Sequence, residues 1–298
     1  MFDSHTHAHF AAFEADYKEV TDRALKAGVG FINVGTQVDT SRRAIEVAHE
    51  YEKQPIYATV GLHPTHTEKS YHDSQELGPA DAKAMADKGW QPNGFTSRGE
   101  EFDPKVYLEM AKDPKVVAIG ECGLDYYRFT TNDEQQTIKT KTRQVEVFIQ
   151  HARIAAAVNK PLMIHCRPSK GSDDAYADIL EILASEELKD IPKISHFYVG
   201  SAHITKHMIE AGFYFTFGGV ITFSRDYDES IKLIPDNRIL LETDAPYVAP
   251  QSKRGQRNEP VNVIEIAQKM AEIRGVDYEK MERMVEENAQ RIFNIKIR

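Results

Sequence analysis

The stretch VVAIGECGLD (residues 116–125) is the longest of several runs in which apolar residues follow one another, and it decides the fold. Its hydrophobicity is continuous and lacks the alternation of a strand with one face in water, which is typical of a parallel strand buried on both faces. Shorter runs of the same kind lie at residues 1–5, 30–35, 56–64, 161–167, 193–197, 213–220 and 239–246. The chain therefore has eight candidate strands.

Helical periodicity marks most of the segments between these strands. We expect helices at residues 15–27, 41–53, 134–158, 174–188, 203–211, 227–234, 261–274 and 278–293. Gly28 is suited to cap the first helix, and Pro260 to open the helix at 261–274. This alternation predicts an α/β fold, a parallel eight-stranded (β/α)8 TIM barrel, with residues 1–298 as a single domain. A doubly wound open sheet competes, but the number of units and the lack of a G-x-G-x-x-G turn favour the barrel.

The composition is that of an ordinary globular protein, with 41% hydrophobic and 28% charged residues among 298. No apolar run reaches the roughly 18 residues of a transmembrane helix, and the first residues do not resemble a signal peptide, so we expect no membrane association. The two cysteines, Cys122 and Cys166, argue against a disulfide scaffold. They favour the cytoplasm, with the nucleus open if the chain is eukaryotic.

The net charge of the chain is −9 at pH 7. Proteins that bind nucleic acid without sequence preference carry a basic patch, which this chain as a whole lacks. If the protein acts on a polyanion, bound cations and a few local arginines must offset the repulsion.

Residues 66–104 interrupt the alternation after the third candidate strand. They are polar and rich in Gly and Pro, with one short helical pattern near 80–88 and the single tryptophan, Trp90. An insertion at this point projects from the carboxyl end of a barrel, where active sites lie. The sequence leaves open whether it is a lid that contacts substrate or a surface insertion.

Polar residues stand at the carboxyl ends of nearly all the candidate strands. They are His5, His7, His63, Glu121, His165, His196 and Asp244. These ends share one rim of a parallel barrel, and such groups are costly among apolar residues unless they are paired or bind a metal. His5 and His7 are two residues apart in a strand, so both can face one cation. His9 falls beyond the strand end, and we expect it on the surface or behind the ligands.

Four histidines and two carboxylates are too many donors for one tetrahedral zinc, which takes three protein ligands and a water. Two metals about 3.5–4 Å apart, bridged by a carboxylate and a water, would use all six. Glu121 is the expected bridge, because its strand lies between the His5/His7 side and the His165/His196 side.

With these residues in place, the chain resembles the TatD family of metal-dependent deoxyribonucleases, within the amidohydrolase superfamily of barrels. The matching stretches, in the family's order between residues 3 and 260, are DSHTHAH, TVGLHP, AIGECGLDYYR, MIHCR, ISHF, FTFGGVITF, LLETDAPY and RGQRNEP. AIGECGLDYYR and LLETDAPY together are the specific part of the pattern.

The resemblance implies roles for the rim residues. His5 and His7 would bind the first metal, His165 and His196 the second, and Glu121 would bridge them. Asp244 would bind a metal and orient the attacking water, and His63 would contact substrate or handle a proton.

Three arginines in or beside the matched motifs are candidates for phosphate contact: Arg128, Arg167 and Arg257. A structural ion pair is the alternative for each. The chain departs from the family at Phe197, where a cysteine is common, at Thr65, where a second histidine often follows HP, and in the length of 66–104. These departures bear on substrate preference and remove no metal ligand.

The implied reaction is hydrolysis of DNA phosphodiester bonds by a hydroxide that two divalent metals activate. The acidic exterior favours exonuclease-like action on single-stranded ends over capture of a duplex. Four imidazoles favour zinc, manganese or nickel, whereas family members are generally regarded as magnesium-supported, so Zn²⁺, Mn²⁺ and Mg²⁺ all remain candidates.

Other activities remain open. One is a dihydroorotase-like or phosphotriesterase-like hydrolase of cyclic amides or esters, although many of those relatives bridge their metals with a modified lysine where this chain has Glu121. Cleavage of an aminoacyl-tRNA ester is a second. A non-catalytic scaffold is a third, and it is disfavoured because no ligand is lost. No protein partner can be inferred, and preference between DNA and RNA stays undetermined.

Overall fold

The computed structural model describes residues 1–68, 71–72, 95–96, 99–127 and 134–297. Eight strands pair in parallel in the order β1-β2-β3-β6-β7-β8-β9-β10. They are β1 (Phe2–Thr6), β2 (Gly30–Val34), β3 (Ile56–Val60), β6 (Val116–Asp125), β7 (Leu162–Arg167), β8 (Lys193–Ser195), β9 (Tyr214–Phe217) and β10 (Ile239–Leu241). A short antiparallel pair, β4 (Tyr71–His72) and β5 (Phe95–Thr96), forms a separate sheet.

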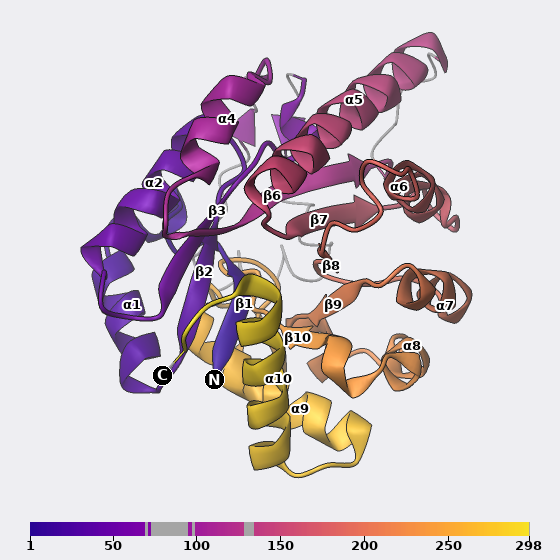
Figure 1. Cartoon of the computed structure of the whole chain (residues 1–298). Helices are drawn as coiled ribbons and strands as arrows, with labels where there is room; N and C mark the ends of the chain where they lie inside the picture. The colour runs from indigo at the N-terminus through magenta and orange to yellow at the C-terminus, as the bar shows by residue number, and fades with distance from the viewer. Residues whose placement is uncertain (69–70, 73–94, 97–98, 128–133, 298) are drawn as a thin grey trace.

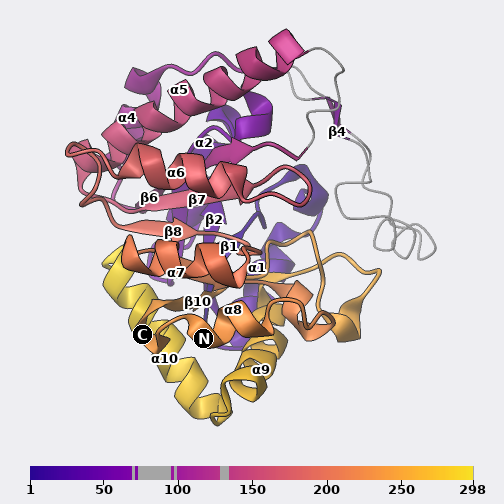
Figure 2. The ribbon, with the colours of Figure 1, turned by 90° about the vertical axis from the view of Figure 1, so that its right-hand side faces the viewer.

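Helices lie outside the strands (Figure 1). They are α1 (Tyr17–Lys26), α2 (Val38–Glu50), α4 (Pro104–Ala111), α5 (Glu134–Val158), α6 (Asp174–Leu183), α7 (Ala202–Glu210), α8 (Asp228–Leu233), α9 (Val263–Arg274) and α10 (Tyr278–Phe293). Figure 2 shows α5, α6, α7 and α8 following one another along the outside of the barrel. The alternation confirms the predicted (β/α)8 barrel. None of the helices in the described ranges combines the length and apolar character needed to cross a bilayer.

The barrel closes between β1 and the chain that follows β10. The amide of Asp244 donates to the carbonyl of His5 at 2.9 Å, and the amide of His7 donates to the carbonyl of Ala245 at 2.7 Å. Asp3 of β1, fully buried, accepts hydrogen bonds from the amide and the hydroxyl of Thr243 at 2.9 and 2.5 Å. The first and last strands are therefore joined by both backbone and side-chain bonds.

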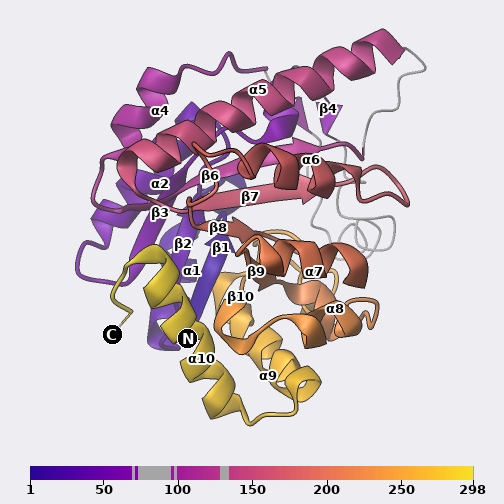
Figure 3. The same ribbon diagram turned by 45° about the vertical axis from the view of Figure 1, so that its right-hand side comes forward.

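The amino end of the barrel is covered by α10 and the residues after it. Ile292, Phe293, Ile295 and Ile297 from this segment form one buried apolar cluster with strand residues that include Phe2, Ile32, Val117, Met163, Ile194 and Leu240. Figure 3 shows the arrowheads of β6 and β7 at the end away from α10. The carboxyl ends of the strands, where the polar residues stand, form the mouth of the barrel, opposite α10.

The structure differs from the prediction mainly at element ends. β3, β9 and β10 are shorter than the runs at 56–64, 213–220 and 239–246, because the chain turns out of the sheet before the polar residues that follow. α4 was not predicted. It begins at Pro104, and the side chain of Asp103 caps it by accepting from the amide of Lys105 at 2.9 Å.

The expected insertion at 66–104 falls largely outside the described residues. The helical pattern near 80–88 and Trp90 belong to that part. Within the segment the structure describes the residues flanking the gaps and the strands β4 and β5.

A buried histidine joins α5 to the loop after β3. His151 donates from Nδ1 to the carbonyl of Val147 at 2.8 Å, and its Nε2 accepts from the amide of Leu62 at 3.0 Å. Both ring nitrogens are thus used by a neutral imidazole, and burial lowers the pKa of His151 to about 4. This contact holds the backbone immediately before His63.

We expect His151 to make the free energy of unfolding depend on pH. The unfolded side chain gains a proton near pH 6.5 and the folded one only near 4, so stability is full above about pH 7 and falls between these values. From pH 8 to pH 5 the loss from this group is about 2 kcal/mol. Urea unfolding of the wild type and of His151→Gln, which cannot take up that proton, measures the difference. If the free energy of unfolding depended on pH equally in the two proteins, His151 would not be the buried neutral histidine described here.

Candidate metal centre

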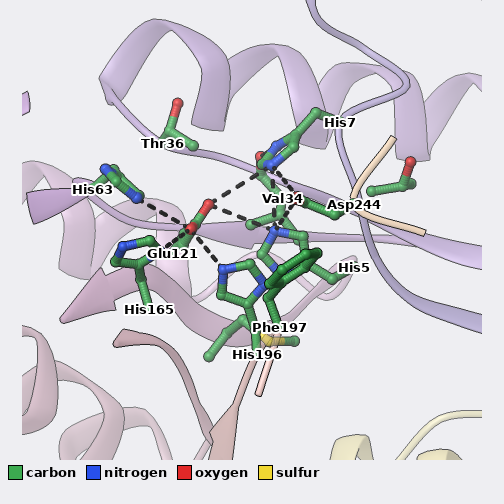
Figure 4. Close-up of polar contacts among 12 residues, drawn as sticks. His5, His7, Val34, Thr36, His63, Glu121, His165, His196, Phe197 and Asp244 are labelled. Atoms are coloured by element: carbon green, nitrogen blue, oxygen red, sulfur yellow. Dashed lines mark hydrogen bonds and ion pairs between the residues drawn. The ribbon is translucent and has the colours of Figure 1, made fainter. Parts of the chain in front are cut away.

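The structure brings together all seven polar residues predicted at the strand ends (Figure 4). His5, Glu121 and His165 belong to β1, β6 and β7. The others, His7, His63, His196 and Asp244, lie just beyond β1, β3, β8 and β10. Gly120 precedes Glu121 with φ 138°, and a Cβ there would lie 2.1 Å from the carbonyl oxygen of Met163, so the close approach of β6 and β7 requires glycine.

One group of donors surrounds a space of cation size. Nε2 of His5 lies 3.2 Å from Nε2 of His7, 3.5 Å from Oε2 of Glu121 and 3.6 Å from Oδ1 of Asp244. Nε2 of His7 lies 3.7 Å from the same oxygen of Glu121 and 3.4 Å from that of Asp244. Ligands at about 2.1 Å from one ion are separated by about 3.0–3.4 Å. The spacing of these atoms therefore fits a divalent cation.

The second carboxylate oxygen of Glu121 faces the other side of the centre. Its Oε1 lies 2.9 Å from Nε2 of His196, 3.1 Å from Nδ1 of His165 and 3.2 Å from Nε2 of His63. Glu121 thus directs one oxygen toward His5 and His7 and the other toward a second set of imidazoles. This is the arrangement expected of a bridging carboxylate.

Hydrogen bonds behind the ligands orient the rings. Nδ1 of His7 donates to the carbonyl of Val34 at 2.8 Å, which leaves the lone pair of Nε2 facing the centre. Nε2 of His165 lies 3.1 Å from Oδ2 of Asp125, and Nδ1 of His196 lies 3.5 Å from Oε1 of Glu242. These partners fix which nitrogen of each ring is directed at Glu121.

His63 differs from the other histidines in its hydrogen bonding. Its distances alone would group it with Glu121 and His165 as a metal ligand. However, its Nδ1 accepts from the amide of Thr65 at 3.2 Å, so the neutral ring carries its proton on Nε2, which donates to Glu121. Burial lowers the pKa of His63, which favours this neutral form. A protonated nitrogen cannot bind a cation, and the geometry therefore makes His63 a donor beside the centre.

The electrostatics of the centre are set by one buried carboxylate among imidazoles. Burial opposes the charge of Glu121, but the surrounding histidines outweigh it and hold the pKa of Glu121 well below its usual range. Burial also disfavours charge on His196, yet Glu121 and Glu242 hold the pKa of His196 well above its usual value. Without a cation, protons on imidazoles compensate the carboxylate. A divalent cation can take their place.

The rim residues line a pocket of about 380 Å³ at the mouth of the barrel. Arg167, at the end of β7, lines this pocket, and its guanidinium lies 4.0 Å from the ring centroid of Tyr127. Of the other two candidate phosphate contacts, Arg128 lies outside the described residues.

Arg257 is held elsewhere. Its guanidinium pairs with both carboxylate oxygens of Asp16, donates to the carbonyl of Ala12 at 2.7 Å and stacks on Phe13. It is not among the residues that line the pocket. The geometry supports the structural ion pair for Arg257 and not the phosphate contact. His9 is likewise buried against His7 and Phe10, where a surface position was one expectation.

Sequence reasoning missed three buried carboxylates that support the ligands. Asp125 faces His165, Glu242 faces His196, and Asp3 accepts from the amide of His5 at 3.2 Å. Each lies in or next to an apolar run, so the cost of burying charge, which singled out the ligands, could have singled out these residues too.

The fold and the site together define the class of protein. Histidines and carboxylates gathered at the carboxyl ends of barrel strands are the active-site architecture of a metal-dependent hydrolase, which this protein is.

Comparison with known proteins gives the family. Residues 2–294 match the family described as TatD related DNase, and the chain belongs to it. It is 33% identical over 298 residues to YabD, a metal-dependent hydrolase of Bacillus subtilis, with 99% of both chains covered. It is 30% identical over 304 residues to the 3′-5′ ssDNA/RNA exonuclease TatD of Shigella flexneri, again with 99% of both covered. The crystal structure of YjjV, a TatD homologue of Escherichia coli, shares the fold, with a TM-score of 0.75, 24% identity and coverage of 99% and 98%.

We expect Glu121→Ala to lose its bound divalent metal, because both groups of donors depend on this side chain. The affinity should fall by more than about 100-fold, beyond the effect of losing a hydrogen-bond partner behind a ligand. Elemental analysis after dialysis measures the content. Glu187→Ala is the control, since Glu187 is exposed and pairs with Arg153 on the surface. Full metal content in Glu121→Ala would show that the bridging assignment is wrong.

Proposed function

We propose that this protein is a nuclease that hydrolyses phosphodiester bonds and removes nucleotides from single-stranded ends, with two divalent cations at its centre. The observation that carries the proposal is the placement of Glu121, which directs one oxygen at each of two groups of donors within a single pocket. His5, His7 and Asp244 would hold one cation with Glu121. His165 and His196 would hold the other.

The cations, when bound, would supply Lewis acidity that lowers the pKa of water and offsets the charge of a phosphate. An imidazole-rich donor set favours zinc, manganese or nickel over magnesium. This local positive charge also reconciles a polyanionic substrate with a chain whose net charge is −9.

The protein's own groups have separate tasks. Asp244 reaches the pocket with a partly exposed carboxylate, which can orient the attacking water and accept its proton. His63 lies at the pocket wall, and its Nε2–H, which donates to Glu121 in this structure, can instead donate a hydrogen bond to an oxygen of the substrate. Arg167 can form charge-assisted hydrogen bonds with the phosphate.

The dimensions of the pocket support an end-acting enzyme. A cavity of about 380 Å³ accommodates a group of small-ligand size and not a duplex. An acidic exterior does not favour broad capture of double-stranded DNA. The name of the TatD relatives, 3′-5′ ssDNA/RNA exonuclease, agrees with this proposal.

Hydrolysis of a cyclic amide or another ester is the second candidate. Many such relatives use a modified lysine as the bridge, and no lysine is among the described residues that line this pocket. Glu121 in that place favours the nuclease.

We expect the metal-loaded protein to shorten single-stranded oligonucleotides from one end and to leave blunt duplexes largely intact. Substrates labelled at the 5′ or the 3′ end, single- and double-stranded, as DNA and as RNA, give polarity and preference in one experiment. EDTA should abolish the reaction. Hydrolysis of an aminoacyl-tRNA ester or of dihydroorotate, with no cleavage of any oligonucleotide, would overturn the proposal.

We expect Arg167→Gln to raise the KM for a single-stranded oligonucleotide by about tenfold, because a charge-assisted hydrogen bond to phosphate contributes about 1.5–3 kcal/mol. Arg257→Gln is the matched control. It removes the bidentate pair with Asp16 and should lower the melting temperature without changing KM. A raised KM in Arg257→Gln together with an unchanged KM in Arg167→Gln would assign the phosphate contact to Arg257.

A further inference from the structure

Two chemically different sets of residues line the pocket over the metal centre. One set is polar and comprises Thr36, His63, Thr65, His66 and Arg167. The other is apolar or aromatic and comprises Phe10, Phe197, Val199, Tyr227, Tyr247 and Val248. The reaction proposed above involves only the polar set and the metal ligands. The apolar set therefore needs a separate explanation.

Phe197 is one of two residues of the apolar set, with Val248, that the fold holds at positive φ. Its φ is +45°, in the left-handed region that bulky side chains avoid. Among the described residues, five other than glycine have positive φ, and three of these, Phe197, Asp244 and Val248, line this pocket. Such conformations are energetically unfavourable and concentrate at functional sites.

Hydrogen bonds impose this conformation on Phe197. Its amide donates to Oε1 of Glu242 at 2.8 Å and to the hydroxyl of Thr216 at 3.0 Å. Glu242 is fully buried and also accepts a short hydrogen bond from Thr216. The backbone of Phe197 is therefore fixed by the same carboxylate that lies behind the metal-centre residue His196.

The ring of Phe197 is supported from behind and accessible from the pocket. A Cβ on Gly218 would lie 3.4 Å from a ring carbon of Phe197, so the ring packs next to Gly218. The ring centroid is 6.2 Å from that of His196, and Figure 4 shows the two side chains next to each other. Phe197 is half-buried and belongs to neither apolar cluster of the core. An apolar ring held at this point is available for contact with a ligand.

We propose that Phe197 is the stacking platform for the terminal nucleobase of a single-stranded end. This inference rests on the proposed nuclease function and names the part of the substrate that the apolar set binds. A base stacked on Phe197 lies beside the metal centre, so the phosphodiester attached to the same nucleotide is presented to Asp244 and the bridging Glu121. Stacking accepts any base because every base has a π-face, so the platform selects an unpaired end and not a sequence.

The test compares oligonucleotides that end in a normal nucleotide with ones that end in an abasic nucleotide. The wild type should prefer the base-terminated substrate in kcat/KM. Phe197→Asn removes the ring, and Asn tolerates the left-handed backbone. In this variant the ratio of kcat/KM for the base-terminated substrate to that for the abasic substrate should fall about tenfold. Phe197→Tyr keeps the ring and should retain the preference.

Phe223→Ala is the matched control. Phe223 is an exposed aromatic residue six positions beyond the end of β9 that does not line the pocket, and the base preference should survive its loss.

A second readout does not depend on turnover. A single-stranded oligonucleotide ending in 2-aminopurine, made nuclease-resistant by phosphorothioate linkages and bound to the metal-loaded protein, should lose fluorescence on stacking against the wild type and Phe197→Tyr but not against Phe197→Asn.

The outcomes separate the two proposals. If the wild type cleaves oligonucleotides but Phe197→Asn keeps the base preference and the quenching, the stacking platform is refuted and the nuclease stands. If the wild type cleaves no oligonucleotide with any metal, the proposed function itself fails. Thermal unfolding of Phe197→Asn establishes that the variant is folded, and relief of the strained backbone favours its stability.

Discussion

The buried carboxylate of Glu121 is the constraint on which the rest of this structure depends. A charge at this depth persists only when compensated, and the five compensating histidines come from four different parts of the chain. They meet only because parallel strands end at one rim and because the first strand is joined to the last. Asp3 makes both connections, since it bonds Thr243 across the closure and the backbone of His5 beside the ligands. Barrel closure and cation binding are therefore parts of one arrangement.

Much of the fold and of the candidate site could be predicted from the sequence. Polar residues in apolar strands are energetically costly, so their presence there indicates a functional role. That cost identified the rim residues, while continuous apolar runs predicted all eight strands and helical periodicity predicted the long helix at 134–158. What escaped it depends on distant contacts. The partner of Arg257 is Asp16, 241 positions away. α4 starts at an Asp-Pro pair inside a Gly- and Pro-rich segment, where the breaker residues concealed the helix signal.

The distinction between His63 and the other histidines shows a different limit. Spacing and strand position make His63 equivalent to them, and its distances in the structure do too. Only the amide of Thr65, which occupies Nδ1, shows which nitrogen carries the proton. One backbone amide beside a metal centre can thus decide the role of a histidine while the set of candidate ligands stays complete.

The packing of α10 under the barrel has a consequence for the entry of substrate and the release of product. With Ile295 and Ile297 filling the floor, the interior is a blind well, and nothing that enters at the rim can pass through to the far side. Substrate and product must therefore enter and leave through the same entrance. A strand degraded stepwise would have to dissociate and rebind after each cleavage, or move along the surface around the pocket entrance. The processivity of the enzyme would therefore be set by that surface.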